Sequence, residues 1–311
     1  MQNLFQKTLA KPISFRGIGL HSGKESNIKL VPLEANNGII FKRIDLKKNN
    51  LIKANYQNVT SAKLCTTLEN SFGANVSTVE HLMAALYISG IDNILIEIDS
   101  SEVPIMDGSS KDFINLIKQA GVKDLLFKRK FLKIIKAMEF IDGEKTISIE
   151  PTKKNDFSLE VDFQLNYQNE IIGKQRNKIK FDDRNLEDIY SSRTFCLFED
   201  IEKIKESGLA KGGSLNNAVV VKKNEILNDG GLRNKKEFVN HKILDLAGDF
   251  LLSGYRIVGS VKCYQGGHNL SNNFLRELFK DKTSHIEINR ENIDIIKKDF
   301  KISTDKIAVN A

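Results

Sequence analysis

Tryptophan is absent from the 311-residue chain, which has only three cysteines, five histidines and four prolines. Cys65, Cys196 and Cys263 are odd in number and far apart, which argues against a disulfide framework or a cysteine zinc knuckle and favours buried, reduced thiols. No apolar run reaches the ~18 residues that a membrane-spanning helix needs. Residues 1–6 lack a basic segment followed by an apolar one, so we predict no signal peptide and expect a cytoplasmic protein.

Charges of both signs are plentiful and nearly balanced. Lysine and arginine number 47 against 40 for aspartate and glutamate, which leaves a formal net charge of +7. The basic residues are interleaved with acids, as in residues 202–206, and no concentrated basic stripe is present. This pattern argues against a nucleic-acid-binding protein. Hydrophobic residues make up 41% of the chain, as in globular proteins, and the length predicts two domains at ~150 residues each.

Hydrophobic periodicity predicts strands followed by a helix in each half of the chain. In the first half we expect a helix that begins near Ser77, which has the capping-box spacing to Glu80, and that stops at Gly90. The shared order of elements predicts two α+β domains, residues 1–127 and 128–311. The other expected elements are strands at 13–19, 26–30, 38–43, 93–98, 131–135, 145–149, 157–165, 218–221 and 257–264, and helices at 111–120, 185–192, 236–252 and from residue 272.

A polar stripe marks the expected helix 236–252. His241 and Asp245 are four residues apart, so their side chains lie on one face about 5–6 Å apart at Cβ, and Asp249 continues the stripe. The helix is otherwise suited to burial, and buried charges must be paired, neutralised or ligated. The same spacing can present two metal ligands from one helical turn, although it also occurs by chance on exposed helices.

Two other histidines lie beside residues that suit catalysis. Glu80 and His81 are adjacent and point about 100° apart on a helix, so they suit a base and a ligand rather than two ligands. A capping box for Glu80 and a surface position for His81 are the alternatives. His268 follows Gly266 and Gly267 after an apolar strand, where active-site residues are often held, or it is an ordinary turn histidine. Two histidines and an aspartate can hold a catalytic Zn²⁺, and a carboxylate and a third histidine nearby complete the equipment of amide hydrolysis.

Short motifs lie along most of the chain in a definite order. They are 17–23 (GIGLHSG), 77–82 (STVEHL), 104–109 (PIMDGS), 193–195 (RTF), 212–214 (GGS), 227–233 (LNDGGLR), 238–245 (FVNHKILD) and 267–270 (GHNL). In these residues the sequence closely resembles the UDP-3-O-acyl-N-acetylglucosamine deacetylases, from residue 17 to about residue 278. The resemblance implies zinc-dependent removal of the N-acetyl group to give UDP-3-O-acyl-glucosamine and acetate, the committed step of lipid A biosynthesis.

The resemblance also implies roles for individual residues. Glu80 matches the general base that activates water. His268 matches the general acid or electrostatic stabiliser, and Asp249 matches its charged partner. Three residues match the family's zinc ligands: His81, His241 and Asp245.

Substrate contacts carry over in the same way. Thr194 matches a hydroxyl that stabilises the oxyanion, Phe195 follows it in the same motif and is a further substrate-binding candidate, and Lys242 matches a lysine near the sugar and diphosphate. Cys65 falls where the family has a cysteine near the metal. It either binds an inhibitory second zinc or, as we favour, is a buried thiol.

The implied fold consists of two α+β sandwich domains of similar topology with the active site between them. A βαβ insert in the second domain forms the passage for the acyl chain in this family, and residues 201–221 match it. Three apolar residues of this stretch are expected to line the passage: Leu209, Leu215 and Val220.

Two positions depart from the family pattern. Gln265 stands where a basic residue is frequent, which removes a charged contact to the diphosphate that Lys262 or Lys242 would have to replace. The family's Asp-Phe-x-His-Pro stretch appears as residues 162–166, in which Phe163 keeps the aromatic ring expected near the uracil and Leu165 replaces the histidine. Neither departure touches the zinc ligands or the acid–base pair.

The expected partner is therefore a UDP-linked acylated amino sugar, bound by a monomer. A basic nucleic-acid-binding protein with a structural zinc is the alternative from another class, but such a zinc usually has four protein ligands. A zinc hydrolase that acts on another nucleotide sugar is a third interpretation. The +7 charge fits an anionic substrate and brief contact with an anionic membrane surface.

Overall fold

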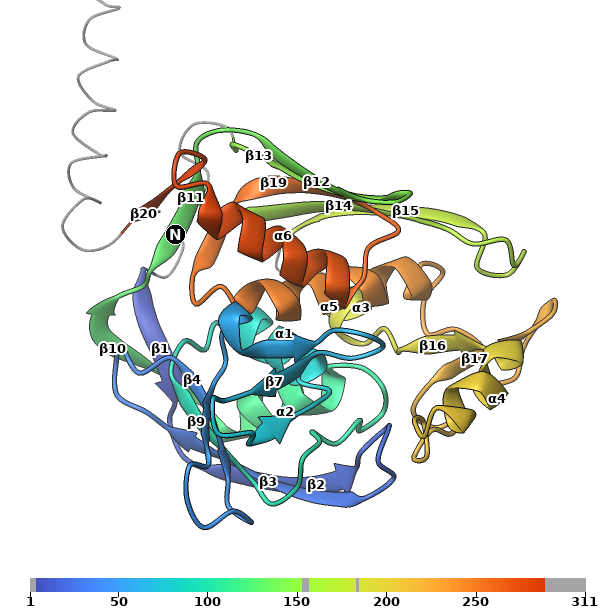
Figure 1. Cartoon of the computed structure of the whole chain (residues 1–311), viewed down its shortest axis with the longest axis horizontal. Coiled ribbons are helices and arrows are strands. Elements are labelled where there is room, and N and C mark those ends of the chain that lie inside the picture. Colours follow the sequence, from blue (N-terminus) through green and yellow to red (C-terminus); the bar gives the residue numbers. More distant parts are fainter. Residues whose placement is uncertain (1–3, 153–156, 183–184, 289–311) are drawn as a thin grey trace, which may run out of the picture.

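A five-stranded sheet forms one outer layer of the molecule (Figure 1). The computed structural model describes residues 4–152, 157–182 and 185–288, which form a mixed α+β structure. Across this sheet the strands are β2 (Ile13–Ile18), β3 (Glu25–Pro32), β9 (Ile94–Ile98), β4 (Ile39–Arg43) and β5 (Leu51–Lys53). Residues alternate between buried and more accessible along β3, β4 and β9, so one face of the sheet turns inward.

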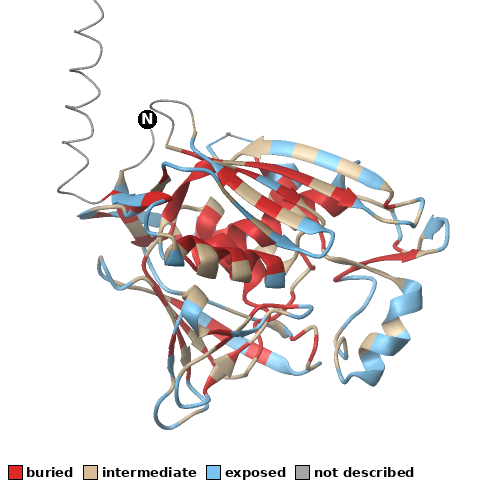
Figure 2. Cartoon of the chain, turned by 45° about the horizontal axis from the view of Figure 1, so that its top comes forward, coloured by how far each residue is buried: buried red, intermediate tan, exposed pale blue. Residues whose placement is uncertain are grey.

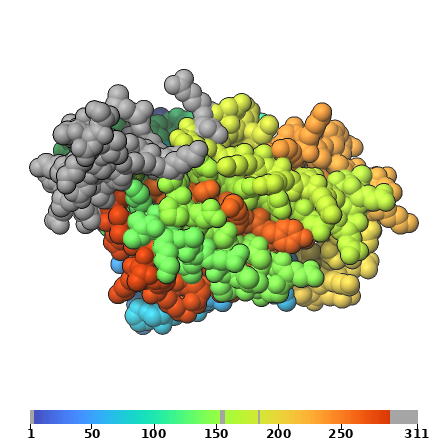
Figure 3. Space-filling view, turned by 90° about the horizontal axis from the view of Figure 1, so that it is seen from above, coloured from blue at the N-terminus to red at the C-terminus, as the bar shows by residue number. Residues whose placement is uncertain are grey.

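A seven-stranded sheet forms the opposite outer layer. Its main path is β12 (Met138–Asp142), β13 (Lys145–Glu150), β19 (Arg256–Tyr264), β11 (Phe131–Ile134) and β20 (His285–Ile288). The strands β14 (Leu159–Asn166) and β15 (Lys174–Lys180) join it through β19. Seen from above, residues of β12 to β15, in green and yellow-green, form most of this face (Figure 3).

Four helices lie between the two sheets. α1 (Glu80–Ile88) and α2 (Lys111–Ala120) accompany the first sheet, and α5 (Glu237–Leu251) and α6 (His268–Lys280) pack beneath the second. α2 buries Phe113, Ile114 and Ile117 at helical spacing, as its periodicity predicts. α1 packs against α5 across the middle of the molecule, where Figure 2 shows buried residues in red. Fourteen of the fifteen residues of α5 are buried, so its polar stripe lies in the interior.

A βαβ element stands to one side of these layers, at the right of Figure 1. It consists of β16 (Phe195–Leu197), α4 (Phe198–Glu206) and β17 (Val219–Lys222), with β18 (Glu225–Ile226) at its edge. β16 and β17 are parallel, so a crossover connection must join them, and α4 supplies part of it. This βαβ element overlaps residues 201–221, where the insert is expected, and its first strand begins before residue 201.

The remaining elements are short or peripheral. They are β1 (Phe5–Leu9) paired with β10 (Val122–Lys128), the three-stranded sheet of β6 (Val59–Ser61), β7 (Thr67–Glu69) and β8 (Asn75–Val76), the 3₁₀ turn η1 (Tyr56–Asn58), and α3 (Glu187–Tyr190). The chain passes from the first group of sheets to the second after Lys128, and the division into two domains stays a prediction. Among the described residues, no helix combines the length and the apolar character that crossing a bilayer requires.

Two predicted helix starts are wrong. Ser77 does not cap α1, because Thr78 takes a left-handed backbone (φ +56°) and the helix begins at Glu80 with Val79 as its N-cap and no side-chain cap bond. α6 begins at His268 rather than near residue 272, with extended Gly267 as its N-cap. Both corrections place a proposed site residue at the start of a helix.

Gly248 permits the close packing of α1 on α5. A Cβ atom at this position would overlap the carbonyl oxygen of Glu80 and would lie 3.1 Å from the backbone nitrogen of Ala84. Both are backbone atoms of α1, which cannot rotate away as a side-chain end can. The absence of a side chain at Gly248 therefore fixes how near α1 can come to α5.

Gly248→Ala should destabilise the protein by about 2 kcal/mol or more, because overpacking a tight contact outweighs the higher helix propensity of alanine. The free energy of unfolding from urea titration measures the effect. Asn115→Ala, on the exposed face of α2, is the matched control and should change stability little. A Gly248→Ala protein as stable as the parent would show that the helices have room to separate.

Candidate active site

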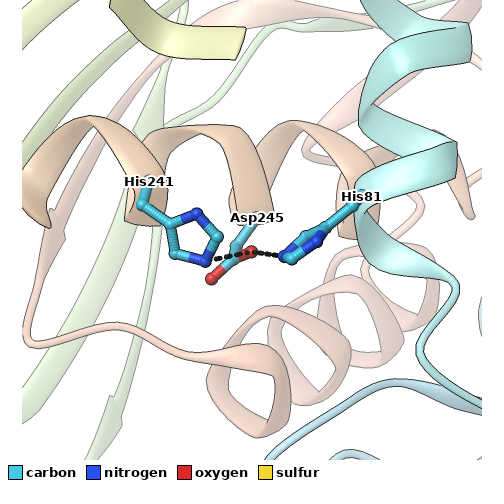
Figure 4. A group of neighbouring side chains, drawn as sticks. All are labelled: His81, His241 and Asp245. Carbon is cyan, nitrogen blue, oxygen red and sulfur yellow. Dashed lines mark ion pairs between the residues drawn. The ribbon is translucent and has the colours of Figure 1, made fainter. Parts of the chain in front are cut away.

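α1 and α5 bring three predicted ligands together from distant parts of the sequence (Figure 4). His81 is the second residue of α1, and His241 and Asp245 lie one turn apart on α5. Asp245 Oδ1 is 3.5 Å from His81 Nε2 and 3.4 Å from His241 Nε2. Each residue offers one ligand atom, and these atoms all lie within 4.8 Å of one another. The predicted one-face arrangement of His241 and Asp245 is therefore present, and His81 completes the group.

The donor atoms of this group suit a divalent metal ion. Burial, together with the positive charges of neighbouring residues, lowers the pKa of His241 to about 3, so its ring is neutral and offers a lone pair. Burial opposes ionisation of Asp245, but the contacts that it makes with its neighbours, among them the Lys242 ammonium 2.7 Å from Oδ2, hold the pKa of Asp245 well below its ordinary value. Asp245 Oδ1 is buried without a hydrogen-bond partner among the described residues. A buried carboxylate oxygen between two imidazole nitrogens is what a bound cation would satisfy.

The ring of His241 is held by a backbone group. Its Nδ1 lies 3.1 Å from the carbonyl oxygen of Ser192, which directs Nε2 toward Asp245. Phe195 packs near the same ring, with centroids 6.3 Å apart. The Nδ1 atom of His81, in contrast, has no partner among the described residues.

Glu80, His268 and Asp249 form a second buried cluster beside the first. His268 Nε2 is 3.6 Å from Glu80 Oε1, and His268 Nδ1 is 2.9 Å from Asp249 Oδ2. Burial raises the pKa of Glu80 above its ordinary value despite the nearby histidines. Burial alone would lower the pKa of His268, but the carboxylates of Asp249 and Glu80 outweigh it and raise that pKa to about 10. A carboxylate with a raised pKa beside a protonated imidazole is an arrangement suited to moving protons.

Thr66 joins these two carboxylates and was not predicted as a site residue. Its backbone N–H donates to Glu80 Oε2 at 3.1 Å, and its hydroxyl donates to Asp249 Oδ1 at 2.8 Å. Glu80 is thus oriented by Thr66 rather than by a capping box with Ser77. No sequence pattern around Thr66 could have revealed this contact, which depends on a fold that joins residues 183 positions apart.

A cavity of about 750 Å³ opens onto both clusters. It is lined by Glu80, His81, His241, Asp245 and His268 together with Thr194, Phe195, Lys242, Tyr167 and Gln265. Thr194 is held by its backbone, since its N–H donates to the carbonyl of Gly108 at 2.8 Å. The cavity therefore contains most of the predicted site residues and adds Tyr167, whose ring packs edge-on against Phe195.

A second, mainly apolar cavity of about 350 Å³ lies in the βαβ element. Leu215 and Val220, two of the residues expected along the acyl passage, line this cavity, whereas Leu209 is not among its lining residues and its neighbour Ala210 is. Residues that the sequence did not single out complete the wall: Phe198, Ile201, Ile204 and Leu227. Thr194 and Phe195 line both cavities, so the apolar space begins beside the polar one.

Phe163, the ring expected near the uracil, is a core residue in this structure. Phe163 is 1% exposed and packs beneath Gly266, where an added Cβ would lie 2.9 Å from its ring. Gln265, the other departure, has a left-handed backbone (φ +54°), and its side chain pairs with both backbone polar groups of Asn166. Gln265 therefore joins the end of β14 to the loop before His268.

Cys65 is a buried thiol close to Glu80, as we favoured. Burial, with a contribution from the Glu80 charge, raises the pKa of Cys65 to about 12. The thiol is therefore protonated at neutral pH in the metal-free protein. Cys263 is likewise buried, whereas Cys196 is half-buried and lines the apolar cavity.

Comparisons with known proteins agree with this geometry. A family model described as LpxC, UDP-3-O-acyl N-acetylglycosamine deacetylase, matches residues 6–280. The chain belongs to this family. A UDP-3-O-acyl-N-acetylglucosamine deacetylase from Geotalea uraniireducens is 45% identical over 275 residues, 88% of each chain. Proteins of the same name from Campylobacter jejuni strain RM1221 and Geobacter sp. strain M21 are each 42% identical, over 90% and 89% of this chain and 93% and 90% of their own lengths.

Membership of the family settles the class of the protein. The chain is a deacetylase, an enzyme of lipid A biosynthesis, as its motifs implied. The match includes α1, α5 and the start of α6, the three helices that carry the two buried clusters. A metal centre at His81, His241 and Asp245 is consistent with this family.

Asp249→Asn should lower the pKa of His268 in the metal-free protein by about 1–3 pH units, because the substitution removes the nearest negative charge from the imidazolium. Nuclear magnetic resonance of ¹⁵N-labelled histidine measures this pKa. Asp99→Asn, which alters a carboxylate bonded to Asn27 on the other side of the first sheet, should leave it unchanged. An unchanged pKa in Asp249→Asn would contradict the electrostatic account of the cluster.

Proposed function

We propose that this chain removes the N-acetyl group of UDP-3-O-acyl-N-acetylglucosamine with one Zn²⁺ held by His81, His241 and Asp245. The observation that carries the proposal is the buried Asp245 Oδ1, which lies between two imidazole Nε2 atoms and accepts no hydrogen bond from the described part of the chain. Three protein ligands leave a coordination position free, as in catalytic rather than structural zinc sites. When bound, Zn²⁺ supplies a Lewis acid that lowers the pKa of a water molecule to ~7 and polarises a carbonyl group.

The chain's own residues divide the proton transfers between them. Glu80 takes the proton of the attacking water, a task that its raised pKa suits near neutral pH. His268, protonated and paired with Asp249, donates a proton to the departing amine nitrogen. The Thr194 hydroxyl lies at the same cavity and donates to the oxygen that gains negative charge. Thr66 keeps Glu80 and Asp249 in register throughout.

The two cavities accommodate the two ends of the substrate. The apolar cavity of Leu215 and Val220 takes the 3-O-acyl chain, which enters past Thr194 and Phe195. The Lys242 ammonium, held at Asp245, contacts the sugar and diphosphate. Phe163 is too buried to stack on the uracil, so an accessible ring would have to replace it, and Tyr167 lines the polar cavity.

We also assign the fold to two α+β sandwiches of similar topology. Each outer sheet is covered on its inner face by a pair of helices, and the site lies where the pairs meet. Ligands to one metal ion would then come from both halves, His81 from the first and His241 and Asp245 from the second. The protein acts as a monomer in this proposal, because one chain supplies every site residue.

Removal of metal tests the proposal most simply. Protein dialysed against a chelator should release no acetate from UDP-3-O-acyl-N-acetylglucosamine, and one equivalent of Zn²⁺ per chain should restore the activity. UDP-N-acetylglucosamine without an acyl chain is the control substrate and should react poorly. Full activity without metal would refute the metal mechanism, and a zinc-loaded enzyme active only on another nucleotide sugar would refute the substrate.

Glu80→Gln should reduce kcat by about 10²- to 10⁴-fold and retain one zinc per chain, because the amide keeps the shape of the side chain but cannot accept a proton. Acetate release and metal content are measured on the same sample. Glu97→Gln, at a half-buried carboxylate paired with Lys42, is the matched control. Loss of zinc together with activity would mean that Glu80 is a ligand or a structural residue rather than the base.

A further inference from the structure

Glu102 is a buried carboxylate with no part in the mechanism above. It is 2% exposed and accepts hydrogen bonds from three neutral donors in two segments of the first half. The backbone N–H groups of His21 and Ser22 donate to it at 2.8 and 2.7 Å, and the hydroxyl of Thr78 donates at 3.0 Å. Burying a carboxylate is costly, so three directed donors indicate a specific structural demand at this point.

One of the donors to Glu102, Thr78, lies close to the proposed catalytic residues in the sequence. Thr78 lies two residues before Glu80, is 3% exposed and has a left-handed backbone (φ +56°). That conformation is unfavourable for a β-branched residue and persists only where the surroundings hold it. The bond from its hydroxyl to Glu102 is one such restraint. Glu102 therefore helps to set the direction in which α1 begins, and with it the places of Glu80 and His81.

The other two donors, His21 and Ser22, belong to a loop that lines the apolar cavity. Leu20 and His21 line that cavity, and their loop binds the segment that follows α4. The N–H of Gly212 donates to Leu20 at 3.0 Å, the N–H of Lys211 donates to the His21 carbonyl at 3.3 Å, and the N–H of Ala210 donates to His21 Nδ1 at 3.4 Å.

A glycine allows this loop to approach the carboxylate. A Cβ on Gly19 would overlap Glu102 Oε2 and would lie 2.5 Å from Ser22 Oγ. This close approach accounts for the glycine at position 19 in the glycine-rich stretch 17–23, which has no role in the proposed mechanism. The βαβ element thus docks on a loop whose position Glu102 fixes.

We propose that Glu102 is a positioning residue that fixes the wall of the acyl cavity relative to the start of α1. The higher kcat/KM that we expect for a long 3-O-acyl chain over a short one therefore depends on Glu102. The inference rests on the proposed function. A chain that fills a rigid cavity can use its binding energy to place the sugar against Glu80 and His81. If the wall of the cavity can move, the acyl chain makes the same contacts but no longer places the sugar against Glu80 and His81. The kcat/KM for the long-chain substrate then falls toward that for the short-chain substrate.

Glu102→Gln tests this directly. An amide has one acceptor oxygen, and its NH₂ group would face a donor where the carboxylate accepts. The kcat/KM for a long-chain 3-O-acyl substrate should fall about ten- to a hundredfold, the effect of leaving buried donors unsatisfied. A 3-O-acetyl substrate should lose much less, so the ratio of the two kcat/KM values should fall about tenfold or more. Zinc content should stay at one per chain.

The variants at Thr78 keep the test decisive if Glu102→Gln fails to fold. Thr78→Ser retains the hydroxyl and should preserve the ratio of the long-chain to the short-chain kcat/KM, whereas Thr78→Ala removes it and should lower that ratio. Glu97→Gln controls for the loss of a charge in the same half. An unchanged ratio in Glu102→Gln, or in Thr78→Ala where Glu102→Gln does not fold, would overturn the inference, and so would an equal loss on both substrates. Wild-type enzyme that releases no acetate in the same assay would instead refute the proposed function.

Discussion

The contact of α1 with α5 at Gly248 is the constraint on which the site depends. Backbone atoms of Glu80 and Ala84 occupy the space that a side chain at Gly248 would need. Glu80 and His81 begin α1, and His241 and Asp245 lie one to two turns before Gly248 on α5. The distance between the two helices at Gly248 therefore sets the distances between these side chains. The two outer sheets support the arrangement by covering the helix pairs on both sides. A displacement of either helix would therefore change the distances between His81 on α1 and the His241–Asp245 pair on α5.

The same packing creates an unusual interior. Glu80, Asp245 and Asp249 lie at about 3% exposure beside three buried histidines, in a region whose other side chains are largely apolar. Such charges oppose folding unless hydrogen bonds, ion pairs or a ligand compensate them. Lys242, Thr66 and the imidazole rings supply part of that compensation, whereas Asp245 Oδ1 accepts no hydrogen bond from the described residues. The deviation from ordinary core chemistry falls at the candidate active site, and such deviations are typical of functional sites.

The sequence predicted the features that are repeated within one element. The apolar spacing of α2 and the His–Asp stripe of α5 each follow from helical geometry, and the apolar residues of β9 mark a strand. The family motifs added His81, Glu80 and His268, which no spacing within one helix could have joined to His241. These parts of the site could be predicted because either helical periodicity or shared motifs specified them.

Features set by contacts between distant segments could not be predicted. Ser77 has the spacing of a helix cap but is displaced by the left-handed turn at Thr78. The side of the sheet on which Phe163 lies depends on the register of β14 with β19, and that register buries it. Thr66 meets Asp249 only through the tertiary fold. In each case the observed structure depends on contacts with residues distant in the sequence, which local sequence patterns do not specify.

We propose that a buried His–His–Asp group, without a thiolate, holds the zinc ion. X-ray absorption at the zinc edge of the reconstituted enzyme tests this most directly, because sulfur ligands lie near 2.3 Å and nitrogen or oxygen ligands near about 2.0–2.2 Å. The account predicts a first shell of nitrogen and oxygen alone, with scattering from two imidazole rings that is reduced in His241→Ala. A sulfur ligand, or a shell unaffected by loss of His241, would contradict it.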